Sequence, residues 1–170
     1  ILRRWGDVPE LTEAVRQIEA SCERLSAVVG QLLVLARIEG SEDVRETDVE
    51  LDAVVLAAAA TTGAGARDRA IEVEHVEQVV VRGDREGLQQ LVVILLDNAL
   101  VHGTGTVRLR VDAEGGQARV SVRDEGPGIP PEELPRIFDH FYRGARAHGE
   151  QRRGSGLGLS IAAALAEDRK

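Results

Sequence analysis

The chain has 170 residues, 43% hydrophobic and 29% charged, so it can fold into one packed domain with an appendage and is too apolar to be intrinsically disordered. Its net charge of −8 and its aromatic content of 2% argue against a nucleic-acid-binding surface, which is normally basic and often stacks bases on aromatic rings. The single cysteine excludes an internal disulfide framework, and no run approaches the roughly 20 apolar residues of a membrane-spanning helix. We therefore expect a soluble, cytoplasmic chain that contacts neither nucleic acid nor membrane.

The first predicted element is a long helix over Pro9–Glu39, because apolar residues recur there at alternating spacings of four and three. This heptad seam comprises Leu11, Val15, Ile18, Cys22, Leu25, Val29, Leu32 and Ala36. Such a seam is typical both of a helix in a coiled coil or bundle and of a single amphipathic helix on its own domain, and it does not decide between them. Additional apolar residues at Ala14, Val28 and Leu35 widen the stripe and favour a four-helix bundle over a two-stranded zipper.

After a polar, acidic connector, 40–47, the pattern mixes helices and strands. Helical periodicity predicts helices over Val49–Ala60 and Arg85–His102. Alternating and β-branched runs predict strands over Ile71–Val76, Val79–Val81, Thr106–Val111 and Gln117–Arg123. The last two strands should form a hairpin, because residues 114–116 make a glycine-rich turn between them.

A stretch rich in glycine, proline and charged residues, Asp124–Arg153, precedes a last helix that is predicted from near Gly156 to about Glu167. Within this stretch only a short helix is predicted, around Pro131–Phe138. The stretch is long for a loop, which is typical of a functional lid.

The first candidate site is the pair Asp97 and Asn98, which interrupts the apolar run of the helix Arg85–His102. The predicted buried face of this helix is Leu88, Leu91, Val92, Leu95, Leu96 and Ala99. A structural interpretation places Asp97 on the solvent face and lets Asn98 cap a neighbouring group, and the pair alone favours it. A functional interpretation is that the Asn98 amide oxygen binds Mg²⁺, a hard ion that prefers oxygen ligands.

The second candidate site is Asp124–Ile129, directly after a predicted strand. One interpretation is a Pro-Gly turn that leaves the sheet. The other is a nucleotide-binding loop, in which Gly126 and Gly128 let the backbone approach a flat ligand while the Asp124 carboxylate accepts a hydrogen bond from an exocyclic amine. Adenine carries such an amine, whereas guanine has an oxygen at the corresponding ring position.

The third candidate site is the glycine-rich run Gly154–Leu159 at the start of the last predicted helix. Glycines at a helix N-terminus expose backbone N–H groups, and the helix dipole adds partial positive charge, so the run favours phosphate binding. The run lacks the lysine of a P-loop and does not follow a strand in a βαβ unit, so neither of those motifs explains it.

Together and in this order, the motifs resemble the ATP site of bacterial sensor histidine kinases. Leu95–His102 is similar to the N box of that family, Asp124–Ile129 to the first glycine box, Ile137–Arg143 to the F box and Gly154–Ile161 to the second glycine box. Leu25–Glu39 resembles the second dimerisation helix, so the resemblance covers nearly the whole chain. The implied fold is α+β: a two-layer α/β sandwich of the Bergerat type, with a mixed sheet backed by helices, preceded by a long dimerisation helix.

The resemblance also assigns roles to residues, with ATP and Mg²⁺ as the implied ligands. Asp124 would recognise adenine and Asn98 would hold Mg²⁺. The full set implied for ATP binding is Asn98, His102, Asp124, Gly126, Gly128, Ile129, Arg143, Gly154, Ser155, Gly156, Leu157 and Gly158. Arg143 would meet the phosphates from the lid, because neutralising the transferred group is most of what a protein contributes to phosphoryl transfer.

Two interpretations are open for each of three other side chains. Arg152 and Arg153 would either join the phosphates or form a solvated charge run, and the charge run is favoured. His102 would either orient a phosphate or cap its helix, and the sequence does not choose.

The chain departs from the family pattern at Ile94 and Val101, where the family has an Asn and a basic residue. Neither side chain can bind a metal or a phosphate, so a degenerate nucleotide-binding regulatory module is an alternative function. Related hydrolytic ATPases have a Glu at position 94, and an aliphatic residue cannot act as a general base, so hydrolysis is disfavoured. Anti-sigma-factor serine kinases are a further alternative because of the similar Asn98 motif, although the heptad helix and Phe138–Arg143 argue against them.

The resemblance divides the chain into residues 1–40, the C-terminal part of the dimerisation and phosphotransfer helices, and residues 41–170, the ATP-binding catalytic domain. The histidines are His75, His102, His140 and His148, and none has the context of a phosphoacceptor. We therefore expect the phosphorylated histidine upstream of Ile1, no catalytic residue within the chain and no autophosphorylation by the chain alone. The family continues beyond Lys170 into a final pair of strands, which we expect to be missing.

The implied partners are a second copy of the chain, through the heptad helix, and the receiver domain of a response regulator. The implied parent kinase works in the cytoplasm, with or without an anchor in the inner membrane. The signal and the cognate regulator are not encoded in recognisable form.

Overall fold

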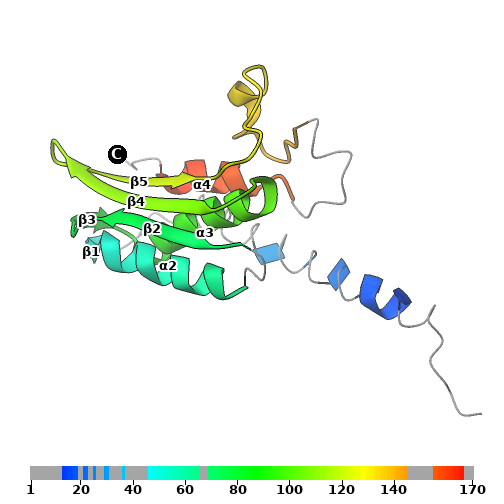
Figure 1. The fold of residues 1–170 in the computed structure, drawn as a ribbon, viewed down its shortest axis with the longest axis horizontal. Coiled ribbons are helices and arrows are strands. Elements are labelled where there is room, and N and C mark those ends of the chain that lie inside the picture. Colours follow the sequence, from blue (N-terminus) through cyan, green and yellow to red (C-terminus); the bar gives the residue numbers. More distant parts are fainter. Residues whose placement is uncertain are drawn as a thin grey trace, which may run out of the picture.

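A computed structural model describes residues 13–18, 21–22, 25, 29–30, 36, 46–65, 69–144 and 155–166 of the chain. From residue 46 onward its elements are β1 (Thr47–Glu50), α2 (Leu51–Gly65), β2 (Ile71–Val76), β3 (Val80–Gly83), α3 (Arg85–His102), β4 (Val107–Glu114), β5 (Gln117–Arg123), the 3₁₀ helix η1 (Leu134–Arg136) and α4 (Gly158–Ala166). Figure 1 shows the long strands beside the helices, with the segment that contains η1 standing beyond the end of β5.

The strands form two sheets. β1 and β3 pair antiparallel, from Thr47 opposite Gly83 to Glu50 opposite Val80. The other sheet has the order β2-β4-β5, in which β2 is parallel to β4 and β4 is antiparallel to β5. This sheet is mixed, as the resemblance implied. Its hairpin turns through Gly115, whose φ of +61° requires the left-handed region that glycine enters without strain.

The main hydrophobic core lies between the three-stranded sheet and the helices α2 and α3. Alternation along β4 turns Val107, Leu109 and Val111 inward, where all three are fully buried. Arg108 and Arg110 point to the opposite face of the sheet. The helices add Leu51, Val55, Ala58, Ala59, Val92, Leu96 and Ala99 to this core. Each fully buried Val or Leu stabilises the fold by roughly 1.5–3 kcal/mol, so this layer holds the α/β sandwich together.

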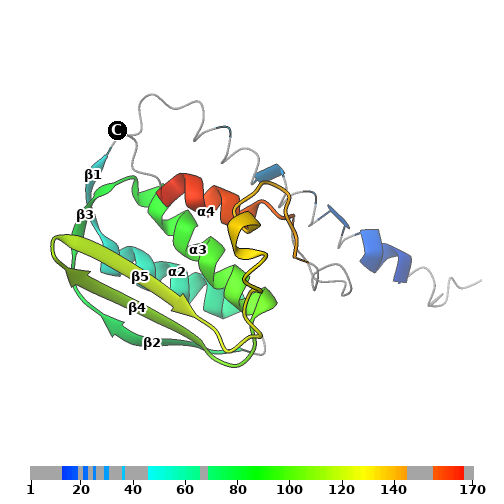
Figure 2. The same cartoon turned by 90° about the horizontal axis from the view of Figure 1, so that it is seen from above.

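Helix α3 is packed on two sides, because it runs between α2 and α4 (Figure 2). On the α4 side a second core consists of Ile94, Leu157, Ile161 and Ala162. The predicted buried face of α3 is confirmed at Val92, Leu96 and Ala99, but it wrongly leaves out Ile94, which is only 6% exposed. A single apolar stripe describes a helix with one buried side, whereas α3 has two.

The prediction of β2, α3 and β5 is confirmed at both ends of each element. The helix predicted over Val49–Ala60 is wrong at its start, because Val49 and Glu50 belong to β1 and the helix begins at Leu51. Val49 lies opposite Val81 of β3, so pairing with a residue 32 positions further along the chain makes this short run a strand.

Other boundaries also differ from the predicted ones. α2 ends at Gly65 rather than Ala60, and β3 and β4 each begin one residue later than predicted. β3 ends at Gly83 rather than Val81, and β4 continues to Glu114 because it pairs with β5 up to the turn. The short helix expected around Pro131–Phe138 is reduced to the single 3₁₀ turn of η1. The last helix begins at Gly158 rather than near Gly156.

Most of the helix predicted over Pro9–Glu39 lies outside the described residues. The described residues between 13 and 36 are helical. Four described members of the heptad seam, Val15, Ile18, Leu25 and Val29, are 46–66% exposed, so the rest of the described chain does not cover them. In the part of the chain that the structure describes, no helix is both long enough and apolar enough to cross a membrane.

Candidate nucleotide-binding site

Asp124 lies directly after β5, at the C-terminal end of α3. Its Oδ1 accepts a 2.6 Å hydrogen bond from the backbone N–H of Gly126, which fixes the carboxylate over its own turn. A Cβ atom on either Gly103 or Gly126 would lie 2.5 Å from this Oδ1. The two glycines therefore let the carboxylate approach the backbone of the loop that follows α3, and any side chain there would displace it.

Two hydrogen bonds join the loop after α3 to the loop after β5. The Thr104 hydroxyl donates to the Glu125 carbonyl at 2.5 Å, and the Glu125 N–H donates back to the Thr104 carbonyl at 3.1 Å. Gly105 adopts a φ of +63° beside the Glu125 side chain. The position of Asp124 is thus tied to residues 103–105.

Asn98 and His102 follow Ile94 at intervals of four, so all three lie along one side of α3. Ile94 marks where that side points, because it packs against α4, with its Cγ2 atom 3.5 Å from the position of a Cβ on Gly158. The half-buried Asn98 therefore lies on the α4 side, between the Asp124 end of α3 and the N-terminus of α4.

The glycine-rich run is placed at the N-terminus of α4. Gly156 has a φ of +76°, and a Cβ there would lie 2.7 Å from the Phe141 carbonyl carbon, so the run touches the end of the F-box segment. The Ser155 Oγ accepts a 3.1 Å hydrogen bond from the Leu157 N–H, and the side chain of Leu157 is fully buried. The first N–H groups of α4 have no partner within the helix, which is the arrangement that binds phosphate.

The remaining predicted residues lie in or near the lid. Gly128 has a φ of +70° with open space around it, and Ile129 is exposed. Arg143 is half-buried, and its F-box neighbours Phe141 and Tyr142 lie against Gly156. Gly154, Arg152 and Arg153 lie outside the described residues.

To hold a metal, Asn98 would need further oxygen ligands from a nucleotide. Partial burial disfavours the charged form of Asp97 and so raises its pKa above the usual value of 3.8. Among the described residues, no three His, Cys, Asp or Glu side chains gather into a metal site. Magnesium in nucleotide sites needs only one or two protein oxygens plus phosphates, and the Asn98 amide would supply one. The residues therefore fit Mg²⁺ bound jointly with phosphate.

The loop 103–105 and Arg69 are contributions to the site that the sequence did not predict. The spacing Gly103-Thr104-Gly105 directly after a long helix was a usable signal, because two glycines around a hydroxyl indicate close backbone contacts. Arg69 gave no signal, because its partners lie thirty or more residues further along the chain.

Comparison with known proteins identifies the family. The model for histidine kinase-, DNA gyrase B- and HSP90-like ATPases matches residues 83–169, which include both glycine-rich runs and Asn98. The chain belongs to this family. The resemblance to histidine kinases that the sequence motifs indicated is confirmed, and so is the α+β fold with a mixed sheet backed by helices.

Individual relatives are sensor histidine kinases. The chain is 34% identical over 171 residues to the sensor histidine kinase YkoH of Bacillus subtilis, across 99% of this chain and 37% of YkoH. The mycobacterial sensor histidine kinase MprB has a TM-score of 0.62 at 30% identity, over 71% of this chain and 78% of that chain. Full-length ShkA in complex with AMPPNP has a TM-score of 0.72 at 25% identity, over 92% of this chain and 33% of that chain. This chain therefore spans little more than a third of the length of YkoH.

Proposed function

We propose that this chain is the ATP-binding catalytic part of a sensor histidine kinase, which transfers the γ-phosphoryl group of Mg·ATP to a histidine. The observation that carries the proposal is the arrangement along α3, with Asp124 against Gly103 at one end and the α4 N-terminus against Ile94 nine residues earlier. Nine helical residues span about 14 Å, which lets a nucleotide place its base at one end and its phosphates at the other. The AMPPNP bound to ShkA supports an adenine nucleotide as the ligand.

Each element has one task in this proposal. Asp124 accepts a hydrogen bond from the exocyclic amine of adenine, while its bond to Gly126 keeps the carboxylate in place. The N–H groups at the start of α4 bind phosphate oxygens, and Arg143 neutralises charge on the transferred group. Asn98 holds Mg²⁺, which supplies further charge neutralisation when bound. His102 either orients a phosphate or caps α3.

The proposal extends to the phosphoacceptor and the partners. Residues 1–40 would belong to the dimerisation helices and 41–170 to the catalytic domain, with the acceptor histidine on a dimerisation helix outside this chain. The exposure of Val15, Ile18, Leu25 and Val29 supports a heptad helix that is covered by a second copy. A response regulator would then receive the phosphoryl group on an aspartate.

A transfer assay in trans tests the proposal. The chain is incubated with Mg²⁺, γ-labelled ATP and a dimerisation-helix segment that carries the acceptor histidine of a related kinase such as YkoH. The expected product is acid-labile, base-stable phosphate on that segment, and none on a segment with the histidine replaced by Gln. The chain alone should acquire no acid-labile phosphate.

The buried side chain of Ile94 favours one competing function, a nucleotide-binding module without transfer, because position 94 offers no oxygen to a metal. Tight Mg·ATP binding with no transfer to any histidine segment would establish this alternative. Acid-stable phosphoserine on an added protein would instead identify an anti-sigma-factor serine kinase.

A further inference from the structure

Arg69 lies between α2 and β2, outside the segment that the family model matches, and donates to four backbone carbonyls. Its Nη1 donates to the carbonyls of Ala99 and Leu100, both at 2.8 Å. Its Nη2 donates to Thr104 at 2.7 Å and its Nε to Gly105 at 2.8 Å. Four of the five N–H donors of a guanidinium are thus committed to one short piece of backbone.

These four carbonyls lie in the last turn of α3 and the loop that follows it. The last carbonyls of a helix have no partner within the helix, and a cation there also meets the negative end of the helix dipole. By bonding Ala99 and Leu100 as well as Thr104 and Gly105, the guanidinium fixes the direction in which the loop leaves α3.

The same loop supports Asp124, the residue that would bind the base. Thr104 exchanges two hydrogen bonds with Glu125, and Gly103 contacts the carboxylate of Asp124. A continuous path therefore runs from Arg69 through Thr104 to Glu125 and its neighbour Asp124.

We propose that Arg69 is a positioning residue for nucleotide binding: it holds the loop 103–105 so that the Asp124 carboxylate meets the exocyclic amine of adenine. This inference rests on the proposed function of Asp124. Arg69 touches neither nucleotide nor metal and acts only through the loop.

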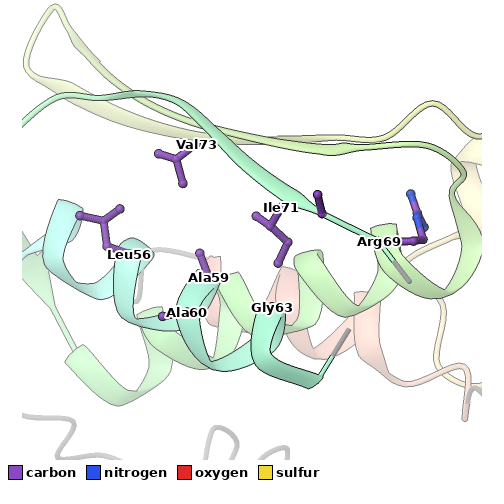
Figure 3. A pocket seen from close by; sticks show the side chains of 8 residues that line it. Leu56, Ala59, Ala60, Gly63, Arg69, Ile71 and Val73 are labelled. Carbon is purple, nitrogen blue, oxygen red and sulfur yellow. The ribbon is translucent and has the colours of Figure 1, made fainter. Parts of the chain in front are cut away.

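Beside Arg69 the described residues form an apolar groove, which offers its guanidinium no carboxylate. Arg69 lies at one end of this open groove of about 470 Å³ between α2 and β2 (Figure 3). The other residues that line the groove are Leu56, Ala59, Ala60, Gly63, Ala70, Ile71 and Val73.

The test compares Arg69→Gln and Arg69→Lys with a control, Arg110→Gln, whose arginine pairs with Asp112 on the outer face of β4. Hydrogen exchange of the nucleotide-free chain reports on the loop. In Arg69→Gln the Glu125 amide, which is bonded to Thr104, should exchange at least about tenfold faster, while Leu96 within α3 is unchanged. Arg110→Gln should change neither amide.

Nucleotide titrations then separate positioning from general stability. The Kd for Mg·ATP should rise about tenfold in Arg69→Gln, roughly the effect of one displaced hydrogen bond to a charged group. The Kd of Arg69→Lys should lie between those of the unsubstituted chain and Arg69→Gln. If Arg69→Gln does not fold, Arg69→Lys is the variant that tests the inference. On an Asp124→Asn background, Arg69→Gln should cause no further loss, because its effect passes through Asp124.

Two results would overturn the inference. One is unchanged exchange of Glu125 in Arg69→Gln, and the other is faster exchange with an unchanged Kd for Mg·ATP. A failure of the proposed function itself is recognised separately, because it appears as no ATP binding by the unsubstituted chain.

Discussion

The backbone N–H of Gly126 donates a 2.6 Å hydrogen bond to Oδ1 of Asp124, so the loop that begins with this carboxylate also immobilises it. An acceptor that is held before the ligand arrives loses little conformational freedom on binding. In the proposed function this one carboxylate would distinguish purines, because it can accept a hydrogen bond from the amine of adenine and repels the carbonyl oxygen of guanine.

Asp124→Asn should weaken Mg·ATP binding by about 10- to 100-fold, the range expected for losing a hydrogen bond to a charged acceptor. The Asn oxygen can still accept from Gly126, which turns the amide NH₂ group toward the adenine amine, donor against donor. The Kd values for ATP and GTP, measured by competition with a fluorescent nucleotide, should therefore move closer together. Asp112→Asn, on the outer face of β4, should leave both Kd values unaltered. An equal loss of Mg·ATP affinity in Asp112→Asn would contradict the assignment of Asp124 to adenine recognition.

Asn98→Ala should abolish the advantage that Mg²⁺ gives to ATP binding. Asn98 is the single asparagine of the chain, and its amide oxygen is the proposed protein ligand of the metal. Calorimetry with and without EDTA should show two different affinities for the unsubstituted chain and one affinity for the variant. Gln89→Ala, on the opposite side of α3, is the control and should keep the difference. A variant at Asn98 that retains the full magnesium dependence would contradict the assignment.

Gly156→Ala should destabilise the chain by about 2–4 kcal/mol, because a positive φ and a steric overlap act together. The new Cβ would lie 2.7 Å from the Phe141 carbonyl carbon. Gly115→Ala is a matched control with a φ of +61° and open space around it, so it should cost only the backbone term, about 1 kcal/mol. Urea unfolding measures both. Equal losses would show that the contact between the glycine run and the F-box segment contributes nothing.

Ile94→Asn should not create a better magnesium site, although it introduces the residue type of the family. Ile94 is 6% exposed and packs against Leu157 and Ile161 of α4. Burying an amide there should lower the free energy of unfolding by about 3 kcal/mol, whereas Ile94→Val should cost about 1 kcal/mol. Chemical denaturation of both variants decides; a stable Asn variant with tighter Mg·ATP binding would mean that this side of α3 opens to the ligand.

Asp97→Asn should raise the melting temperature near neutral pH, with a gain that shrinks as the pH falls. Partial burial raises the pKa of Asp97 in the folded chain above 3.8, so the folded state holds its proton more tightly than the unfolded state does. The unsubstituted chain consequently loses stability as the pH rises from 3.8 through the folded pKa, and the variant escapes this loss. The effect should be small, because solvent reaches Asp97 and screens it.

Asp112→Asn is the control of opposite sign for a melting series from about pH 3 to about pH 7. The hydrogen bond from Arg110 lowers the pKa of Asp112, so this variant should melt below the unsubstituted chain at neutral pH and match it in acid. If the melting temperatures of both variants differ from that of the unsubstituted chain by the same amount at every pH, the surroundings do not shift the pKa values of these carboxylates as described.

The sequence predicted correctly those helices and strands whose periodic or alternating pattern lies entirely within the element. The periodic helix α3 and the alternating strands β2 and β5 were placed to the residue, because local pattern and tertiary role agree in them. β1 was missed because four residues become a strand only through pairing with β3. Ile94 was missed as a core residue because the packing of α4 on a second side of α3 cannot be read from one periodic stripe.

In the candidate site, too, local contacts follow from the sequence and contacts between distant residues do not. Asp124 and Gly126 stand two residues apart, so their contact follows from a local turn. The loop 103–105 meets this turn across 21 residues of chain, from Thr104 to Glu125. Arg69 meets the loop across 36 residues, at Gly105, so only the folded arrangement shows these contacts.

Calorimetric titration of Mg·ATP into the intact, folded chain is the most direct test of the central claim. We predict one nucleotide per chain with a Kd of about 1–100 µM, a range typical of enzyme substrates, and much weaker binding of Mg·GTP. A folded sample that releases or absorbs no heat with Mg·ATP, or that binds both nucleotides equally, would contradict the assignment of Asp124 as an adenine-binding residue.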